Sequence, residues 1–433
     1  MSRKVVLATV GSLGDLHPFI ALGQALKLHG VNIVVASAPE YRGKVEAAGL
    51  RFHPLRPGFD ELQHDLRMSR AELVRRVVRS SDFLFRKLVI PYVRVAYEDM
   101  MMATADADLV LASSLAFGAR LAAEKRGIPW IAVVLQPMMF LSSYDPPVLP
   151  GFNWLSAALR GLGPAATRRA LWLLKKAVNT VFAPLHALRA ELQLPPVSED
   201  PLFDGQFGAA GAIGLYSRLL GDVRPDYPQP TTIVGFATFD SEHGLAAGID
   251  PNLAAFLDAG SAPLVFTLGS LMINRPGSFY RESVIAARSL GRRAVLLAGD
   301  QTAAELAHLN SPQAFVCPYA PHSQLFPRAV AIVHHGGIGT LAQALRAGRP
   351  QLIVPYFADQ LDNAVRATRL GVAQWLAPDR YRAATASRDI DHLLGAASYL
   401  ARARQVGDSV AAEDGAEGAA RIVLDTLEQL GSN

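Results

Sequence analysis

The sequence predicts an α/β protein that consists of two parallel-sheet units, and three observations support this fold class. Short β-branched runs end at glycine and precede segments whose apolar residues have helical spacing. The same order of strand, glycine and helix begins again in the second half of the chain. The length of 433 residues and the hydrophobic content of 50% suffice for two large domains, each with its own core. A mainly disordered chain is therefore excluded.

The first fifty residues predict one strand–helix–strand unit. Residues 4–10 form a β-branched run that ends at Gly11, as expected of a buried parallel strand. Residues 18–29 carry apolar side chains at helical spacing and end at Gly30, and residues 31–36 predict the next strand. The pattern recurs with a strand, a helix and a strand at 109–113, 121–126 and 130–135.

The second half predicts a second sheet that is built in the same way. A helical stretch that ends at Gly348 follows the third of its strands. The proline-rich stretch 224–230 predicts a linker, so we expect one domain at 1–228 and another at 232–412. The predicted strands of the second sheet are 263–268, 293–298, 329–334 and 351–355.

Charge and cysteine content exclude several classes of protein. The net charge of +4 is small and no basic stripe alternates with aromatic residues, so we expect no nucleic-acid partner. The single cysteine excludes a disulfide framework and a cysteine-rich zinc site. The sequence shows no signal-peptide pattern and no apolar run long enough to span a membrane. We therefore expect a cytoplasmic protein.

The excess of positive charge lies in the first half of the chain. Residues 1–230 carry 26 Lys and Arg and 20 Asp and Glu, whereas residues 231–433 carry 16 and 18. Two regions that are helical by spacing, 67–102 and 155–194, carry basic residues on one side. They are either solvated faces of surface helices or a basic rim that faces a membrane surface or an acidic amphiphile. The basic residues concerned are Arg75, Arg76, Arg79, Arg168, Arg169, Lys175 and Lys176.

A glycine-rich turn follows the first predicted strand, at residues 11–18. It lacks the G-x-G-x-x-G fingerprint of dinucleotide binding, which disfavours a Rossmann oxidoreductase. Asp15 stands at the carboxyl end of the strand, where open α/β sheets place their ligands, and is a candidate general base. The alternative is that Asp15 caps the following helix or closes the turn. His17 precedes Pro18, so we expect it to be extended and to serve packing.

A second glycine-rich turn lies at residues 334–341. Its glycines allow a ligand to approach the backbone, and the N-terminus of the helix that follows favours an anion. The alternative is a plain strand–helix turn with a packed pair of histidines. A metal site is not expected, because no third ligand has a suitable spacing. After the next strand, Asp359 and Gln360 suit a polyhydroxyl ligand such as a sugar, with helix capping by Asp359 as the alternative.

These segments resemble the nucleotide-sugar signature of GT-B fold glycosyltransferases. The resemblance rests on YAPH at 319–322, on HHGGIGTLAQALRAGRPQLIVP from His334, and on DQLDN at 359–363. The opening GSLGDLHPFIALGQAL resembles the same superfamily, of the family 1 and 28 type. It is similar to the branch of sterol glucosyltransferases, glycopeptide-antibiotic glycosyltransferases and the rhamnosyltransferase of rhamnolipid synthesis. The segments VLASSLAFGARLAAEKRGIP, DPPVLP and LVFTLGS are most similar to the rhamnosyltransferase.

The resemblance covers nearly the whole chain and implies a two-domain architecture. In the GT-B fold, two Rossmann-like parallel-sheet domains face each other across a cleft. Residues 1–228 would then bind the acceptor and residues 232–412 the nucleotide-sugar donor. A C-terminal helix, at about 416–433, would cross back onto the first domain.

The resemblance also implies roles for single residues. Asp15 falls at the catalytic-base position, Tyr319 stacks on the base of the nucleotide, and His335 contacts the diphosphate. Plant members carry a Glu where Gln343 stands and an Asn-Ser where Gly339-Thr340 stands. These differences leave open whether the base of the nucleotide is uracil or thymine, and which sugar is transferred. The implied donor-binding residues are Gly14, Ser270, Tyr319, Ala320, His322, His335, Gly337, Gly339, Thr340, Gln343, Asp359 and Gln360.

The expected function is inverting transfer of a hexosyl group from a UDP- or dTDP-sugar to a hydroxyl of a hydrophobic acceptor. The acceptor would be a lipid or an aromatic natural-product aglycone, and no cofactor or metal is expected. Alternatives are a GT-B nucleotide-sugar epimerase and a non-catalytic nucleotide-sugar-binding protein. We expect a monomer or weak dimer, with peripheral association at the inner membrane face as a further option. Candidate acceptor residues, for which core packing is the alternative, are His17, Phe83, Phe85, Met138, Met139, Phe140, Leu141 and Tyr144.

Overall fold

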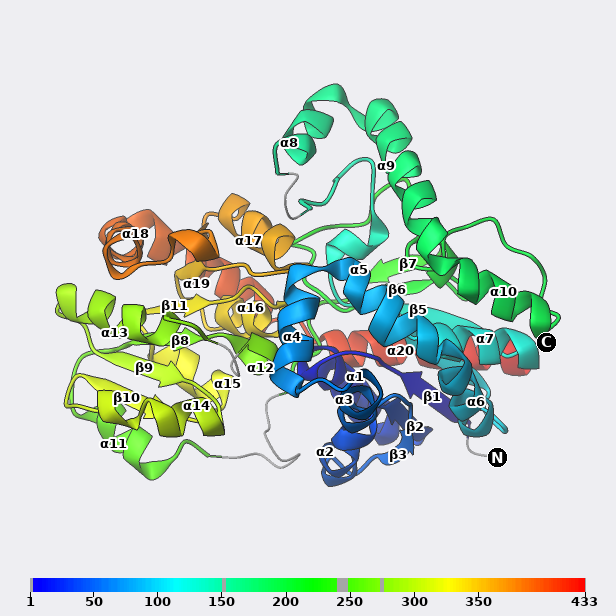
Figure 1. The fold of residues 1–433 in the computed structure, drawn as a ribbon, viewed down its shortest axis with the longest axis horizontal. Helices are drawn as coiled ribbons and strands as arrows, with labels where there is room; N and C mark the ends of the chain where they lie inside the picture. Colours follow the sequence, from blue (N-terminus) through cyan, green and yellow to red (C-terminus); the bar gives the residue numbers. More distant parts are fainter. Residues whose placement is uncertain (1–2, 150–152, 240–247, 273–275, 433) are drawn as a thin grey trace. The chain divides into compact units, whose positions relative to one another are not determined.

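The computed structural model describes residues 3–149, 153–239, 248–272 and 276–432. The chain divides into two compact units, Met1–Phe239 with Asp414–Asn433, and Asp240–Glu413. Each unit contains one parallel sheet with helices on its faces (Figure 1). The predicted α/β fold class with two parallel sheets is thereby confirmed.

The first sheet has seven parallel strands in the order β3-β2-β1-β4-β5-β6-β7. The central strands β1, β2 and β4 consist mostly of buried aliphatic and small residues, and Val6 of β1 pairs with Val34 of β2 and Val110 of β4 in the core. Such fully buried runs are typical of parallel strands with both faces covered. The strands are β1 (Lys4–Ala8), β2 (Asn32–Ser37), β3 (Arg51–Pro54), β4 (Leu109–Ser113), β5 (Trp130–Val134), β6 (Ala212–Gly214) and β7 (Thr231–Ile233).

The helices of the first unit include one from the end of the chain. Helix α20 packs on α1, and a Cβ on Gly415 would lie 2.3 Å from the Gly235 carbonyl oxygen, which shows how closely α20 approaches this unit. The α-helices are α1 (Leu13–Leu28), α2 (Arg42–Ala47), α3 (Phe59–Leu66), α4 (Arg70–Arg79), α5 (Ser81–Phe83), α6 (Val93–Ala103), α7 (Phe117–Arg126), α8 (Asn153–Leu162), α9 (Pro164–Asn179), α10 (Ala183–Glu191) and α20 (Gly415–Ser432).

The second sheet has six parallel strands in the order β10-β9-β8-β11-β12-β13. Its strands are β8 (Leu264–Thr267), β9 (Ala294–Leu297), β10 (Ala314–Cys317), β11 (Ala331–His334), β12 (Gln351–Ile353) and β13 (Ala373–Trp375). Its α-helices are α11 (Pro251–Asp258), α12 (Gly269–Met272), α13 (Phe279–Ser289), α14 (Asp300–Glu305), α15 (His322–Leu325), α16 (Ile338–Arg346), α17 (Gln360–Arg369), α18 (Ala383–Gly395) and α19 (Ala397–Ala411).

The start of α1 differs from the sequence prediction. The helix begins at Leu13 rather than at Pro18, which lies inside it, and the expectation that His17 is extended is wrong, since His17 is helical. The steric bias of a residue before proline is a preference, and the N-terminal cap at Ser12 outweighs it. Pro18 removes one backbone hydrogen bond from α1, and the helix nevertheless continues through it to Leu28.

The proline-rich stretch 224–230 lies within the first unit. Strand β7 follows it and completes the first sheet, and the division between the units comes after Phe239. No helix in the described ranges is both long enough and apolar enough to cross a bilayer.

Candidate functional site

The turn after β1 is shaped by the cap of helix α1. Ser12 is the N-cap residue, and its Oγ accepts a hydrogen bond from the Gly14 N–H at 3.2 Å. The Asp15 Oδ2 accepts hydrogen bonds from the Ser12 N–H at 2.7 Å and from the Ser12 Oγ at 3.1 Å. These reciprocal bonds form a capping box, so Asp15 does take part in capping the helix.

The Asp15 carboxylate also has the features that a general base requires. Burial raises the pKa of Asp15 above its usual range, although the hydrogen bonds from Ser12 act in the opposite direction. The backbone N–H and the hydroxyl of Ser12 both donate to Oδ2, so these two bonds do not occupy Oδ1. The close fit depends on Gly11, because a Cβ there would lie 2.2 Å from Asp15 Oδ2. Sequence reasoning found the turn but not this contact.

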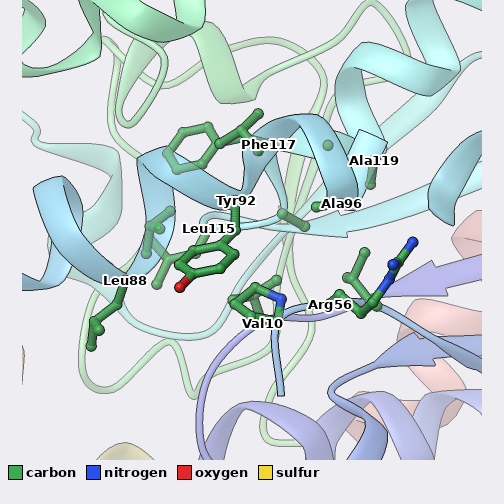
Figure 2. A pocket seen from close by; sticks show the side chains of 14 residues that line it. Val10, Arg56, Leu88, Tyr92, Ala96, Leu115, Phe117 and Ala119 are labelled. Carbon is green, nitrogen blue, oxygen red and sulfur yellow. The ribbon is translucent and has the colours of Figure 1, made fainter. Parts of the chain in front are cut away.

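An apolar pocket lies at the carboxyl ends of β1 and β4 (Figure 2). These two strands are neighbours at the point where the strand order of the sheet reverses, which is the usual ligand position in open α/β sheets. Val10, at the end of β1, donates its N–H to Ser113 Oγ at 3.3 Å and thereby ties the two strand ends together. The lining is mostly aliphatic and aromatic, and Figure 2 labels Val10, Leu88, Tyr92, Ala96, Leu115 and Phe117 among its residues.

The two polar side chains of this pocket are engaged with acidic partners. The Arg56 guanidinium forms a salt bridge with the buried Asp99 at 2.6 Å. The Tyr92 hydroxyl donates a hydrogen bond to Asp65 at 2.9 Å, and burial together with this carboxylate raises the pKa of Tyr92 to about 12. The charge of Arg56 in the lining is therefore balanced by Asp99. Sequence reasoning missed its lining residues, since locally each is an ordinary core residue.

The predicted acceptor residues lie elsewhere in the first unit, and none of them lines this pocket. Phe140 is buried and stacks on Tyr227 at 4.0 Å between ring centroids, as expected of core packing. His17 packs against Phe239 at 5.4 Å, and Phe83 lies beneath the Arg76 guanidinium. Of the remaining ones, Met138, Met139 and Phe85 are half-buried, Leu141 is buried and Tyr144 is exposed.

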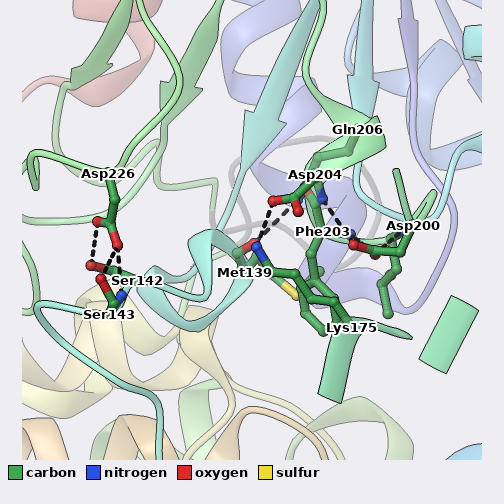
Figure 3. A network of polar contacts seen from close by, with 10 residues as sticks. Met139, Ser142, Ser143, Lys175, Asp200, Phe203, Asp204, Gln206 and Asp226 are labelled. Carbon is green, nitrogen blue, oxygen red and sulfur yellow. Dashed lines mark hydrogen bonds and ion pairs between the residues drawn. The ribbon is translucent and has the colours of Figure 1, made fainter. Parts of the chain in front are cut away.

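The loop after β5 that carries Met138–Tyr144 is held by a carboxylate from the proline-rich stretch (Figure 3). Asp226 accepts hydrogen bonds from the Ser142 Oγ at 2.7 Å, the Ser143 N–H at 2.6 Å and the Ser143 Oγ at 2.7 Å. Burial alone would raise the pKa of Asp226, but these donors outweigh it and hold the pKa below its usual range. The sequence had suggested only a linker around Asp226.

The two histidines of the second glycine-rich turn have different environments. His334 is buried, its Nε2 lies 2.9 Å from Gln351 Oε1, and its Nδ1 accepts a hydrogen bond from the Gly336 N–H at 3.1 Å. His335 is half-buried, and its Nδ1 finds no hydrogen-bond partner within the described ranges. Burial, together with the charges of His334 and His322, lowers the pKa of His335 to about 3. His334 is thus structural, and His335 is a neutral imidazole that can donate one hydrogen bond.

Two glycines make room for the His335 ring. A Cβ on Gly269 would lie 2.3 Å from its Cε1 atom, and a Cβ on Gly337 would lie 2.3 Å from its Nε2 atom. Gly269 follows β8 and His335 follows β11, and these strands are neighbours where the order of the second sheet reverses. Ser270 belongs to the short helix α12, and its side chain lies outside the described part of the structure.

The N-terminus of α16 lies directly beyond this ring. Its N-cap is Gly337, which supplies no side-chain cap, so the N–H groups of the first turn point outward without a side-chain acceptor. Such a helix start favours a phosphate or other anion. Gly339 in this turn is exposed, whereas Thr340 and Gln343 are buried.

The segment with Asp359 and Gln360 packs against the same turn. The Asn363 Nδ2 donates hydrogen bonds to the Gly336 carbonyl at 3.0 Å and to Asp359 Oδ2 at 2.7 Å. Gln360 Oε1 accepts the Tyr356 N–H at 2.8 Å, so part of this amide shapes the loop. The structure therefore places Asp359 and Gln360 beside the turn that carries His335, with Asn363 as a bridge that sequence reasoning did not assign.

The three remaining predicted residues follow β10 at the edge of the second sheet. Tyr319 is half-buried and Ala320 is buried. His322 begins α15 and stacks on Phe326 with 4.3 Å between ring centroids. As to metals, the described residues contain no group of three or more His, Cys, Asp or Glu side chains placed to hold an ion.

Two family models match parts of the chain. Residues 5–143 match the N-terminal domain of glycosyltransferase family 28. Residues 290–425 match the C-terminal domain of erythromycin biosynthesis protein CIII-like proteins. The two matches fall in the first half and the second half of the chain, in the order that the sequence analysis expected.

Two curated relatives and one solved structure align over most of the chain. O-mycaminosyltylonolide 6-deoxyallosyltransferase from Streptomyces fradiae is 28% identical over 98% of both chains. Glycosyltransferase GtfE from Amycolatopsis orientalis is 30% identical over 85% of both chains. The crystal structure of glycosyltransferase VinC in complex with dTDP is 20% identical and superposes with a TM-score of 0.68, over 98% of this chain and all of that one.

Proposed function

The chain is a member of the glycosyltransferases that are related to GtfE, with a family 28 N-terminal domain, and from this membership we propose its reaction. We propose that it transfers a hexosyl group from a UDP- or dTDP-sugar to a hydroxyl of an apolar natural product or lipid, with inversion. The first unit binds the acceptor and the second binds the nucleotide sugar. The relative that is an O-mycaminosyltylonolide 6-deoxyallosyltransferase, and the dTDP bound to VinC, support this assignment.

The observation that carries the proposal is the turn with Asp15. Its carboxylate has a raised pKa, is held in place by Ser12 through Oδ2, and belongs to the turn that follows Val10 of the apolar pocket. A hydroxyl of an acceptor bound in the pocket loses its proton to Asp15 as it attacks the anomeric carbon. The bond from that carbon to the diphosphate breaks in the same step, so the configuration inverts.

The second unit supplies the groups that stabilise the leaving diphosphate. The N–H groups at the start of α16 and the neutral imidazole of His335 donate hydrogen bonds to its oxygens. Asp359 and Gln360 bind the hydroxyls of the sugar, and Tyr319 stacks on the base. The helix start carries a partial positive charge, so we propose that the reaction needs neither a cofactor nor a metal.

The reaction is tested with a panel of UDP- and dTDP-sugars and a set of hydroxylated lipids, phenols and macrolide aglycones, followed by mass spectrometry. A hexose added to an apolar acceptor is the expected result. Release of the nucleotide with no glycosylated product would contradict the proposal and favour an epimerase or a hydrolase. Tight nucleotide binding without any turnover would favour a binding protein.

The pocket assignment predicts a selective loss of acceptor affinity when the pocket is filled. Leu88→Trp places a larger ring in the lining, and we expect KM for the acceptor to rise about tenfold or more, since an apolar group of leucine size contributes about 1.5–3 kcal/mol on burial. KM for the donor should stay unchanged. Leu28→Trp, at a fully exposed site on α1, is the matched control. Equal kinetics for the two variants would place the acceptor elsewhere.

A further inference from the structure

The outer face of helix α9 combines exposed apolar residues with unpaired positive charge. Trp172 is 54% exposed and Leu173 is 61% exposed, and Leu162, the last residue of the preceding helix α8, is 69% exposed. On a helix of sixteen residues, Arg168, Arg169 and Lys176 share this exposed side with Trp172 and Leu173. Figure 1 shows α8 and α9 standing away from the strands of the first sheet.

The opposite face of α9 anchors the helix to the first unit. Leu171 is buried in a cluster with Phe182, and Thr167 Oγ1 donates a hydrogen bond to the Leu159 carbonyl at 2.9 Å. Lys175 turns inward to Asp204 at 2.6 Å, as Figure 3 shows. Because this face is anchored, the side chains on the opposite face of α9 keep pointing away from the core of the first unit.

The charge on this face has no acidic counterpart. Residues 146–190 contain six Lys and Arg and no Asp or Glu. The described residues form no salt bridge with Arg168, Arg169 or Lys176, and Lys176 Nζ lies 4.2 Å from the centre of the Trp172 ring. The other basic helix of the sequence analysis differs, since both Arg75 and Arg76 on α4 pair with Glu72. Of these two helices, α9 is the one whose described basic residues stay unpaired on the exposed side.

We propose that the outer face of α9 binds an anionic lipid surface, with the helix lying in the plane of the membrane. Trp172, Leu173 and Leu162 enter the boundary between headgroups and acyl chains, and Arg168, Arg169 and Lys176 contact the lipid phosphates. This arrangement of a fixed apolar stripe, a tryptophan and flanking cations is that of interfacial helices. The binding does not depend on the transferase reaction, and it would bring an apolar acceptor dissolved in the bilayer close to the first unit.

The test is co-sedimentation of the full chain with vesicles. Vesicles of phosphatidylglycerol and phosphatidylcholine in equal parts are compared with phosphatidylcholine alone, at about 0.1 M salt and at about 1 M salt, where the Debye length falls from about 10 Å to about 3 Å. We expect binding to the anionic vesicles at the lower salt only. Arg168→Gln with Arg169→Gln should weaken it about 25-fold, at about fivefold for each cation. Trp172→Ser with Leu173→Ser should weaken it at least tenfold.

The matched control removes the same charge from an exposed helix of the second unit. Arg281 and Arg288 on α13 flank the exposed Ile285, and Arg281→Gln with Arg288→Gln should leave vesicle binding within about twofold of the parent. Circular dichroism shows whether each variant is folded. Equal losses in the two double variants, or equal binding to neutral vesicles, would overturn the proposal. So would a dimer in sedimentation equilibrium that Trp172→Ser with Leu173→Ser dissociates while no vesicle is bound.

Discussion

Asp15→Asn is expected to lower kcat for glycosyl transfer by about 10²- to 10⁴-fold, the usual contribution of a general base. The amide keeps the shape of the side chain, and its oxygen can still accept the Ser12 N–H, so the capping box should persist. What is lost is a group that can take the proton of the acceptor hydroxyl. The Kd for UDP or dTDP, measured by calorimetry, should stay within about twofold, because the groups proposed to hold the base and the diphosphate, Tyr319, His335 and the start of α16, belong to the second unit.

A second variant separates catalysis from capping. Ser12→Ala removes the Oγ that bonds to both Gly14 and Asp15 but keeps the carboxylate. We expect it to lower the free energy of unfolding by about 1 kcal/mol and to leave most of kcat. If Asp15→Asn retained kcat within about threefold of the parent and lost only stability, Asp15 would be a helix cap and no more.

The pH profile gives an independent measure of the same group. The base must be deprotonated to act, and burial raises its pKa, so kcat/KM should fall as the pH drops through that raised pKa. The acid limb should therefore lie above the pKa of about 3.9 that a free Asp shows. In Asp15→Asn this limb should be absent from the residual activity. An unchanged limb in that variant would assign it to another residue.

The strands were predictable because their residues are both β-branched and buried on two faces. Residues 4–10 and 263–268 correspond to β1 and β8, shortened only at their ends. The start of α1 was missed for a local reason, since Pro18 suggested a boundary while the capping pair Ser12 and Asp15 lies before it. There the energy of capping outweighed the bias before proline.

The pocket and the histidine site could not be predicted to the same degree, because they depend on contacts between distant segments. The pocket lining joins Val10 with residues 55–57, 88–96 and 115–119, and an apolar residue in any of these looks like core. Likewise, nothing in the sequence near His335 indicates that Gly269 lies against its ring. Motifs predicted which residues belong to the donor site, whereas the three-dimensional packing shows which contacts surround them.

Gly337 leaves space for the ring of His335, and replacing this glycine is expected to lower the catalytic activity strongly. Gly337→Ala puts a Cβ 2.3 Å from the His335 Nε2 atom, too close for the ring to stay in place. Displacing a donor that stabilises charge in the transition state costs about 10²- to 10³-fold, and we expect kcat/KM for the nucleotide sugar to fall by that amount. Gly395→Ala, at an exposed position with open space around it, should be neutral.

A double-mutant cycle decides whether the glycine acts through the ring. If Gly337 serves only to admit His335, then Gly337→Ala should cost nothing further once His335→Ala has removed the ring. The two single variants and the double variant should then share nearly the same kcat/KM, with unchanged melting temperatures. A further large loss in the double variant would contradict this. It would mean that the backbone of Gly337, at the N-cap of α16, contacts the diphosphate itself and that the alanine changes the conformation of this backbone. The cycle therefore identifies either His335 or the helix start as the main anion contact. Titration of the same variants with inorganic pyrophosphate gives a second test, since pyrophosphate binding should be abolished only where the contact with the start of α16 is lost.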